Sequence, residues 1–71
     1  MTRPAPTARQ LEVVQAIAQL TAAEGYGPTL REVAGHLRCH WTNVAKLARK
    51  AQAAGLLEHE PGRARSWRVV K

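Results

Sequence analysis

The chain has 71 residues, of which 45% are hydrophobic and 23% charged, and its formal net charge is +6. This composition is that of one small folded domain and excludes a disordered chain. No apolar run approaches the roughly 20 residues that cross a bilayer. The single cysteine, Cys39, excludes an intramolecular disulfide framework and suits a reducing compartment.

The excess of positive charge lies in the C-terminal half of the chain. Residues 1–37 contain three arginines and three glutamates, whereas residues 38–71 contain eight lysines and arginines and two glutamates. Cations spread evenly would indicate only a solvated surface. Cations gathered in one half favour a face that binds a polyanion.

The first element that we expect is a helix over residues 8–24, preceded by a loose arm at residues 1–6. Thr7-Ala-Arg-Gln10 has the form of a capping box, in which each end of the segment satisfies a free backbone N–H of the other. Gly25 supplies a left-handed residue that ends the helix. Apolar residues recur at steps of three and four and predict one buried stripe, made of Leu11, Val14, Ile17 and Leu20 with Val13 and Ala18 beside them.

A second helix is predicted over residues 30–37, after a short loop at Tyr26-Gly-Pro28 in which Tyr26 would pack. Thr29-Leu-Arg-Glu32 forms another capping box at its start. Gly35 within the helix predicts a close contact with another helix. The residues expected on its buried side are Leu30, Val33 and Leu37.

A three-residue turn, Arg38-Cys-His40, leads to a third helix over residues 41–54 that ends at Gly55. Turns of this length between short helices are typical of a helix-turn-helix unit. At 100° per residue, one side of the third helix is apolar and faces the core, and it consists of Val44, Ala48 and Ala51. Long cations and short polar groups occupy the opposite side and its edges.

This exposed face has the chemistry of a DNA-reading helix, because arginine and lysine bridge guanine O6 and N7 while asparagine pairs with adenine. The residues expected at base edges are Thr42, Asn43, Lys46 and Arg49. Those expected at the DNA backbone are Arg38, His40 and Lys50, with capping of the third helix as a second role for His40. The alternative is an ordinary solvated face, but such a helix carries acidic partners one turn away, and none occurs between Arg38 and Glu58.

Beyond Gly55 the apolar period changes to two, which predicts two short strands, at Leu57 and His59 and at Trp67 and Val69. Pro61-Gly62 between them suits the central pair of a type II turn. Three helices and a hairpin predict a mainly α winged helix-turn-helix domain over residues 7–71. The hairpin arginines expected to contact the DNA backbone, unless they serve only to discourage strand pairing, are Arg63, Arg65 and Arg68.

Several segments resemble the N-terminal DNA-binding domain of the LexA repressor family, over residues 7–70. They are Thr7-Ala-Arg-Gln10, Glu12-Val13, Gly25-Tyr-Gly-Pro-Thr29, Glu32-Val-Ala34 and Leu37 in the helices, and Ala54-Gly-Leu-Leu57, Gly62, Arg65 and Arg68 in the hairpin. The resemblance implies a winged helix-turn-helix whose third helix reads the major groove of an operator. It also implies a bacterial or phage transcriptional regulator, most often a repressor.

The sequence departs from that family in four ways. Arg38 stands where the family has a glycine in the turn, and the turn and reading helix are shorter by a residue. Lys46 and Leu47 stand in the region of the family's base-contacting glutamates, so the resemblance carries over no operator sequence. The 71 residues contain no counterpart of the family's self-cleaving and dimerising domain, and we therefore expect no self-cleavage from this chain, as a stand-alone protein or as a fragment.

Catalytic and metal chemistry has weaker support. Four residues could offer zinc ligands, namely His36, Cys39, His40 and His59, but adjacent Cys and His side chains rarely face one metal. A Cys–His nucleophile would need an orienting acid and a cleft. We therefore expect no metal, no cofactor and no enzymatic activity, with Cys39 as a small packing residue. Trp67 is expected in the core, and Trp41 either half-buried at the turn or stacked on a base or sugar.

The leading hypothesis is thus sequence-specific binding of double-stranded DNA, by a monomer or a homodimer. The alternative is a small protein-interaction module that uses the same basic face to bind a host repressor, polymerase or nuclease. An exposed apolar patch around Leu47 and Trp41 would favour that alternative. In either case we expect a cytoplasmic, nucleoid-associated protein of a bacterium or phage-infected cell, without a membrane or small-molecule partner.

Overall fold

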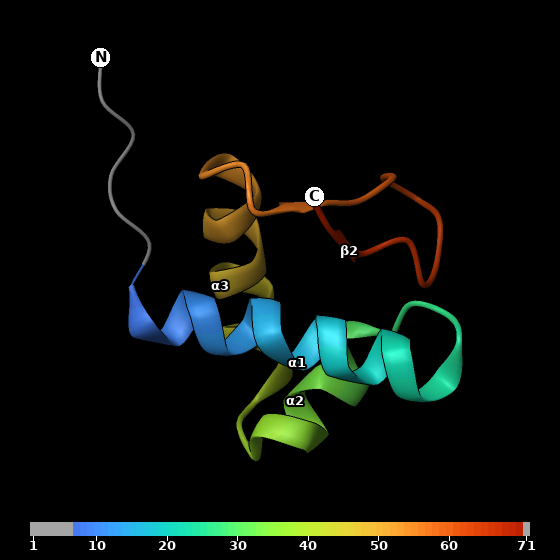
Figure 1. The fold of residues 1–71 in the computed structure, drawn as a ribbon. Coiled ribbons are helices and arrows are strands. Elements are labelled where there is room, and N and C mark those ends of the chain that lie inside the picture. The colour runs from blue at the N-terminus through green and yellow to red at the C-terminus, as the bar shows by residue number, and fades with distance from the viewer. Residues whose placement is uncertain (1–6, 71) are drawn as a thin grey trace.

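The computed structural model describes residues 7–70, so the predicted arm at residues 1–6 lies outside the described part of the chain. Three helices are followed by two short strands (Figure 1). Their bounds are α1 Ala8–Glu24, α2 Leu30–Leu37, α3 Trp41–Ala53, β1 Leu57–Glu58 and β2 Arg68–Val69. The three predicted helices are confirmed, the third to within one residue at its C-terminal end.

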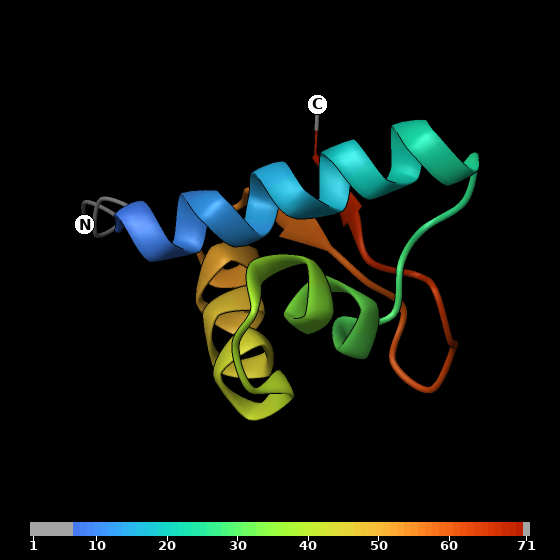
Figure 2. The same ribbon diagram turned by 90° about the horizontal axis from the view of Figure 1, so that it is seen from below.

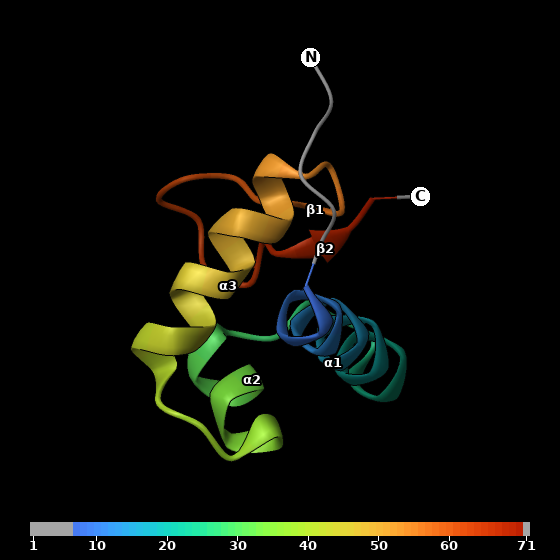
Figure 3. The same ribbon diagram turned by 90° about the vertical axis from the view of Figure 1, so that its left-hand side faces the viewer.

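The helices form two layers that the hairpin joins. α1 crosses one side of the molecule, and α2 and α3 lie on the other side (Figure 2). The two strands pair antiparallel, with Leu57 opposite Val69 and Glu58 opposite Arg68. β1 packs against α3 and β2 against α1, so the hairpin closes the core beyond the last helix (Figure 3). This is the predicted winged helix-turn-helix fold.

Both predicted capping boxes are present. The Thr7 hydroxyl accepts from the backbone N–H of Gln10, and the Gln10 side chain accepts from the backbone N–H of Thr7. Thr29 and Glu32 make the same reciprocal pair at the start of α2. Gly25, at φ 81°, ends α1. The local sequence therefore determines where the first two helices begin.

The buried stripe of α1 differs from the prediction. Val13, Ala16 and Ile17 are buried, whereas Leu11 is 42% exposed and Ala18 is also exposed. The predicted Val14 and Leu20 are partly buried at the margin of the core. Gln10 folds back on Thr7 and is buried together with Val13 and Ile17. Leu11 lies about 160° from Val13 and about 120° from Ile17 around the helix, so it points away from the core.

A left-handed residue ends both α2 and α3. Arg38 has φ 56° and ψ 45°, and its N–H donates to the Gly35 carbonyl at 3.4 Å. The N–H of Cys39 donates to the Ala34 carbonyl at 3.0 Å. These two bonds make a Schellman motif, the usual end of a helix that turns sharply. Gly55, at φ 82°, ends α3 as predicted.

The predicted type II turn of the hairpin is confirmed. Gly62 has φ 79°, and the N–H of Arg63 donates to the Glu60 carbonyl at 3.1 Å. The strands are shorter than predicted, because the Ser66 hydroxyl bonds to backbone groups of the loop and holds it away from a regular ladder. His59 and Trp67 consequently lie outside the paired strands.

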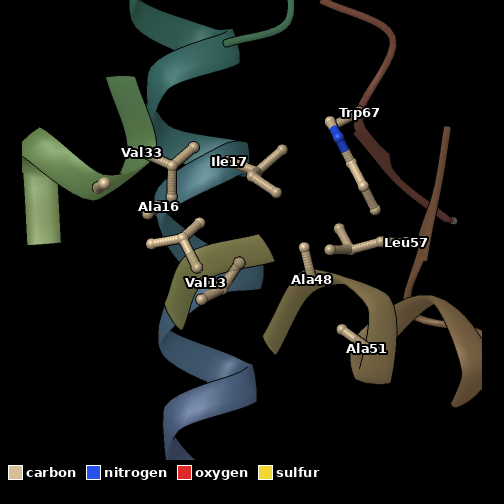
Figure 4. Close-up of a cluster of buried hydrophobic side chains, with 10 residues drawn as sticks. Val13, Ala16, Ile17, Val33, Ala48, Ala51, Leu57 and Trp67 are labelled. Atoms are coloured by element: carbon tan, nitrogen blue, oxygen red, sulfur yellow. The ribbon is translucent and has the colours of Figure 1, made fainter. Parts of the chain in front are cut away.

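The core is one cluster of apolar side chains from all three helices and the hairpin, most of them small or branched (Figure 4). Its buried members are Val13, Ala16, Ile17, Val33, Ala34, Val44, Ala48, Ala51, Leu57 and Trp67. The expected burial of Trp67 is therefore confirmed. The predicted close helix contact at Gly35 is wrong, because Gly35 lies on the exposed side of α2 with open space around it. Within residues 7–70 no helix has the length and apolarity that a membrane span requires.

Candidate nucleic-acid interface

The side of α3 that faces away from the core carries the residues predicted to contact bases. Val44, Ala48 and Ala51 are buried, as the helical periodicity predicts. The residues of this helix predicted to contact DNA are all exposed, and they are Thr42, Asn43, Lys46, Arg49 and Lys50. The structure thus presents these five residues to solvent on one helix, in reach of a ligand that lies along it.

The cations of the described chain fall into two groups. The chain has 11 lysines and arginines, and all except Arg3 and Lys71 lie within residues 7–70. Four of these nine form ion pairs with glutamates: Arg9, Arg63, Arg65 and Arg68. The other five described cations form no ion pair, and they are Arg31, Arg38, Lys46, Arg49 and Lys50. All five lie on α2, α3 or the turn between them, so the uncompensated positive charge belongs to the helix-turn-helix.

His40 caps α3. Its Nδ1 accepts from the backbone N–H of Thr42 at 3.2 Å and lies 2.8 Å from the Thr42 hydroxyl. Because Nδ1 acts as an acceptor here, the neutral ring carries its proton on Nε2. The capping role considered for His40 is confirmed, and it also holds the Thr42 side chain in place at the start of the helix.

Arg38 reaches its exposed position through an unusual backbone conformation. Its φ of 56° is in the left-handed region, where a side chain costs roughly 1 kcal/mol. Glycine is the residue that this position normally favours. The turn therefore carries an exposed arginine at a strained position.

Two of the three hairpin arginines form local ion pairs. Arg63 Nη1 lies 3.1 Å from Glu60 Oε2, and Arg68 Nε lies 3.1 Å from Glu58 Oε1. Both pairs are largely exposed, with the two arginine side chains more than 70% accessible. Exposed pairs of this kind contribute about 0–1 kcal/mol. A phosphate can therefore compete with the glutamates for these arginines.

Arg65 is held more firmly than the other hairpin arginines. Its Nη1 donates to Glu32 Oε1 at 2.6 Å and to the Gly27 carbonyl at 3.4 Å, and its guanidinium lies 4.8 Å from the Tyr26 ring centroid. Tyr26, predicted to pack in its loop, is 51% exposed and contributes this contact. The Arg65 backbone is also left-handed, at φ 58°. These contacts join the hairpin to the start of α2, and we call them the wing latch: Arg65, Glu32, Tyr26 and Gly27.

Glu32 serves both the capping box and the wing latch. Its Oε1 accepts from the Thr29 backbone N–H at 2.9 Å as well as from Arg65. The Thr29 backbone bond, followed by the Thr29 hydroxyl and the Arg65 charge, lowers the pKa of Glu32 below its ordinary value of 4.5, against an opposing effect of desolvation. The ionised carboxylate is thus the form that the fold stabilises.

An exposed helix with uncompensated cations, set in a winged helix-turn-helix, has the geometry of a duplex-binding module. The chain matches the family of LexA DNA-binding domains over residues 5–66. The chain belongs to this family. It is also similar to LexA repressor 2 of Geobacter sulfurreducens (strain ATCC 51573 / DSM 12127 / PCA), with 40% identity over 60 residues. That match covers 83% of this chain and 30% of the Geobacter protein, so the chain spans less than a third of its relative.

In this LexA-type domain the structure adds two residues to the candidate interface, neither of which is among the site residues predicted from the sequence. Arg31, on α2, places its guanidinium 5.5 Å from the ring centroid of Trp41, the first residue of α3. Trp41 was expected half-buried or on DNA, and 42% of it is exposed. The sequence does carry a signal for Arg31. The acidic residue beside it is Glu32, and the capping box already engages that carboxylate with the Thr29 backbone N–H, so Arg31 is left without an ion-pair partner within residues 7–70.

The residues considered for zinc or nucleophilic chemistry serve separate contacts in this LexA-type domain. His36 bonds to Gln19, His40 caps α3, and His59 stacks on Trp67 with ring centroids 4.1 Å apart. Cys39 is partly buried and packs against the core, as expected. Within residues 7–70 no three side chains of the metal-binding types come together.

Proposed function

We propose that this LexA-type domain binds double-stranded DNA sequence-specifically and acts as a transcriptional repressor, with α3 in the major groove. One observation carries the proposal: the five described cations without a glutamate partner all lie on the helix-turn-helix. Such a face attracts a polyanion. The Geobacter relative is named a repressor, which supports the regulatory part of the proposal.

We assign the exposed residues of α3 and its turn to two roles. Thr42, Asn43, Lys46 and Arg49 would read base edges, since they offer the donors and acceptors that the major groove matches. Arg38 and Lys50 would fix the backbone by charge, with the Nε2 proton of His40 as a further donor. The domain would act by binding and not by catalysis.

The hairpin would make the second contact, with different roles for its arginines. Arg63 and Arg68 would exchange their glutamates for phosphates, because exposed ion pairs hold them weakly. Arg65, which we predicted at the backbone, has three partners within the chain. Its main role would be to fix the position of the hairpin through the wing latch.

The test is selection of binding sequences from random duplex DNA, followed by affinity measurements at several salt concentrations. We expect an enriched motif bound at least about a hundredfold more tightly than mixed-sequence DNA. The logarithm of affinity should fall with the logarithm of salt concentration with a slope of about −4 to −6, as four to six phosphate contacts require. A palindromic motif would support a homodimer on DNA.

Variants of single residues separate the two roles. Lys46→Ala and Arg49→Ala should each cost about 1–3 kcal/mol of discrimination at particular base pairs. Arg63→Ala should weaken all sequences alike and reduce the salt slope by about 1. Arg65→Ala should weaken all sequences with a smaller change of slope. Equal losses on selected and mixed DNA for Lys46→Ala and Arg49→Ala would contradict the base-reading role.

A protein-interaction module would give a different result: weak, salt-sensitive DNA binding without an enriched motif, together with capture of an acidic protein. The exposed large apolar residues of the described chain are Leu11, Tyr26, Trp41 and Val70. They come from α1, the loop after it, α3 and the residue that follows β2. Leu47 is partly buried against the core, so the apolar patch that would favour this function is reduced to Trp41.

A further inference from the structure

Trp41 is exposed at the point where α2 and α3 meet. It is the first residue of α3, and 42% of its surface is accessible, whereas Trp67 is 8% exposed. Tryptophan is enriched at interfaces because its indole offers a large apolar face and a polar N–H. Its neighbours are polar: the His40 ring lies 6.2 Å away at an interplanar angle of 27°, and Arg31 reaches it from α2.

The Arg31 guanidinium has an aromatic partner and no carboxylate. Its central carbon lies 5.5 Å from the Trp41 ring centroid, within the range of a cation–π contact. This contact orients the guanidinium without neutralising it. The four paired arginines differ in this respect, because each has a glutamate within 3.1 Å. Arg31 therefore keeps its charge and its N–H donors available for an anion.

We propose that Arg31 and Trp41 form a clamp for the sugar–phosphate backbone of one DNA strand, beside the reading face of α3. The proposal rests on the proposed DNA-binding function and deepens it. The Arg31 guanidinium would donate to a phosphate, and the indole would pack against the adjoining deoxyribose.

The position of Trp41 favours a contact of its ring with the sugar–phosphate backbone over a contact with a base. On the helical wheel Trp41 lies about 60° from Val44, which is buried, whereas Lys46 lies about 160° from it. Trp41 thus borders the reading face and does not project from its centre. Bases within an intact duplex are stacked and offer only their edges, so a ring at this margin meets the backbone of the strand.

The two tryptophans allow a direct test by fluorescence. Trp41→Phe leaves Trp67 as the only tryptophan. Acrylamide, a neutral quencher, should quench the emission of the free wild-type protein through exposed Trp41 and should affect Trp41→Phe little. Addition of a mixed-sequence duplex of about 20 base pairs, two helical turns, should protect the wild-type emission from the quencher.

The salt dependence tests the role of Arg31. Arg31→Ala should weaken binding to selected and mixed duplexes by the same factor and reduce the salt slope by about 0.9, the value for one phosphate contact. Arg31→Lys should keep the slope. The matched control is Arg9→Ala, which removes one positive charge from an exposed arginine of α1 that is paired with Glu12, and it should leave the slope unchanged. Thermal unfolding of each variant confirms that it is folded.

The outcomes separate the clamp from the function on which it rests. If the duplex binds but Trp41 stays as accessible as in the free protein, or if Arg31→Ala leaves the slope unchanged, the clamp is overturned and DNA binding stands. If the wild-type protein binds no duplex at low salt, the proposed function fails and the clamp fails with it. Protection of Trp41 together with the loss of one contact in Arg31→Ala supports both.

Discussion

At the scale of single residues, Arg38 combines a strained backbone with a charge on the face that we propose binds DNA. It ends α2 in a left-handed conformation that favours glycine, and it carries one of the five unpaired cations. Arg38→Gly should therefore raise the free energy of unfolding by about 1 kcal/mol, because the strain is removed. The same variant should bind all duplexes more weakly and with a salt slope reduced by about 1. Urea unfolding and salt titrations measure the two effects.

Arg38→Lys is the control for this prediction. Lysine keeps the charge and the strained backbone, so stability and slope should stay near those of the wild-type protein. If Arg38→Gly lost stability, the left-handed turn would depend on contacts of the arginine side chain and not on the Schellman bonds.

Glu32 gives a prediction for pH. Its pKa in the folded protein lies below 4.5, first because the Thr29 backbone N–H bonds to the carboxylate. A carboxyl group whose pKa is lowered by folding stabilises the fold above its unfolded-state pKa, and that contribution is lost as the pH falls through the folded-state pKa. Glu32→Gln should therefore have a lower melting temperature than the wild-type protein near neutral pH, and the difference should shrink below pH 4.5. A difference that is constant from pH 7 to pH 3 would contradict this account.

At the scale of elements, the sequence predicts the helix ends better than the buried faces. The ends depend on neighbours in the chain: Thr7 with Gln10, Thr29 with Glu32, and the glycines that follow α1 and α3. The buried face of α1 depends on how Gln10 and Ala16 meet the other helices, and the apolar residues of this segment allow two overlapping stripes. Periodicity alone does not distinguish them.

Gly35 illustrates the same limit in α2. Sequence reasoning expects a glycine inside a helix to mark a close contact, but a Cβ here would meet no heavy atom within 4 Å. Gly35→Ala should therefore stabilise the domain by about 0.5–1 kcal/mol, because alanine restricts the unfolded chain and favours the helix. Chemical denaturation measures the change, and a loss of stability would show that α2 needs the freedom of glycine.

At the scale of the whole molecule, the wing latch was beyond sequence reasoning. The charge count correctly places the cations in the C-terminal half, yet three of them lie opposite glutamates in the folded chain. Arg65 and Glu32 are 33 positions apart, and only the tertiary structure brings them together. Helical periodicity is enough to predict the candidate site on α3. It does not predict which glutamate each arginine of the hairpin pairs with.

Gly27 tests how closely the hairpin docks on the helices. A Cβ at this position would lie 2.6 Å from the Arg65 carbonyl oxygen and 3.0 Å from that of Trp67. Both atoms belong to the backbone, so the hairpin would have to move. Gly27→Ala should cost about 1–3 kcal/mol of stability and weaken DNA binding. Gly35→Ala, the same substitution in open space, is the control.

The two-residue strands have a consequence for hydrogen exchange. A hairpin with so short a ladder is held to the helices by side chains, chiefly Leu57, Arg65 and Trp67, and we expect it to open more readily than the helices unfold. We expect the amides of residues 57–69 to exchange faster than those in the middle of α1 and α3. A duplex that binds the closed form then has to select it from this equilibrium. We therefore expect the affinity of the domain for a duplex to depend partly on the fraction of molecules in which the hairpin is closed.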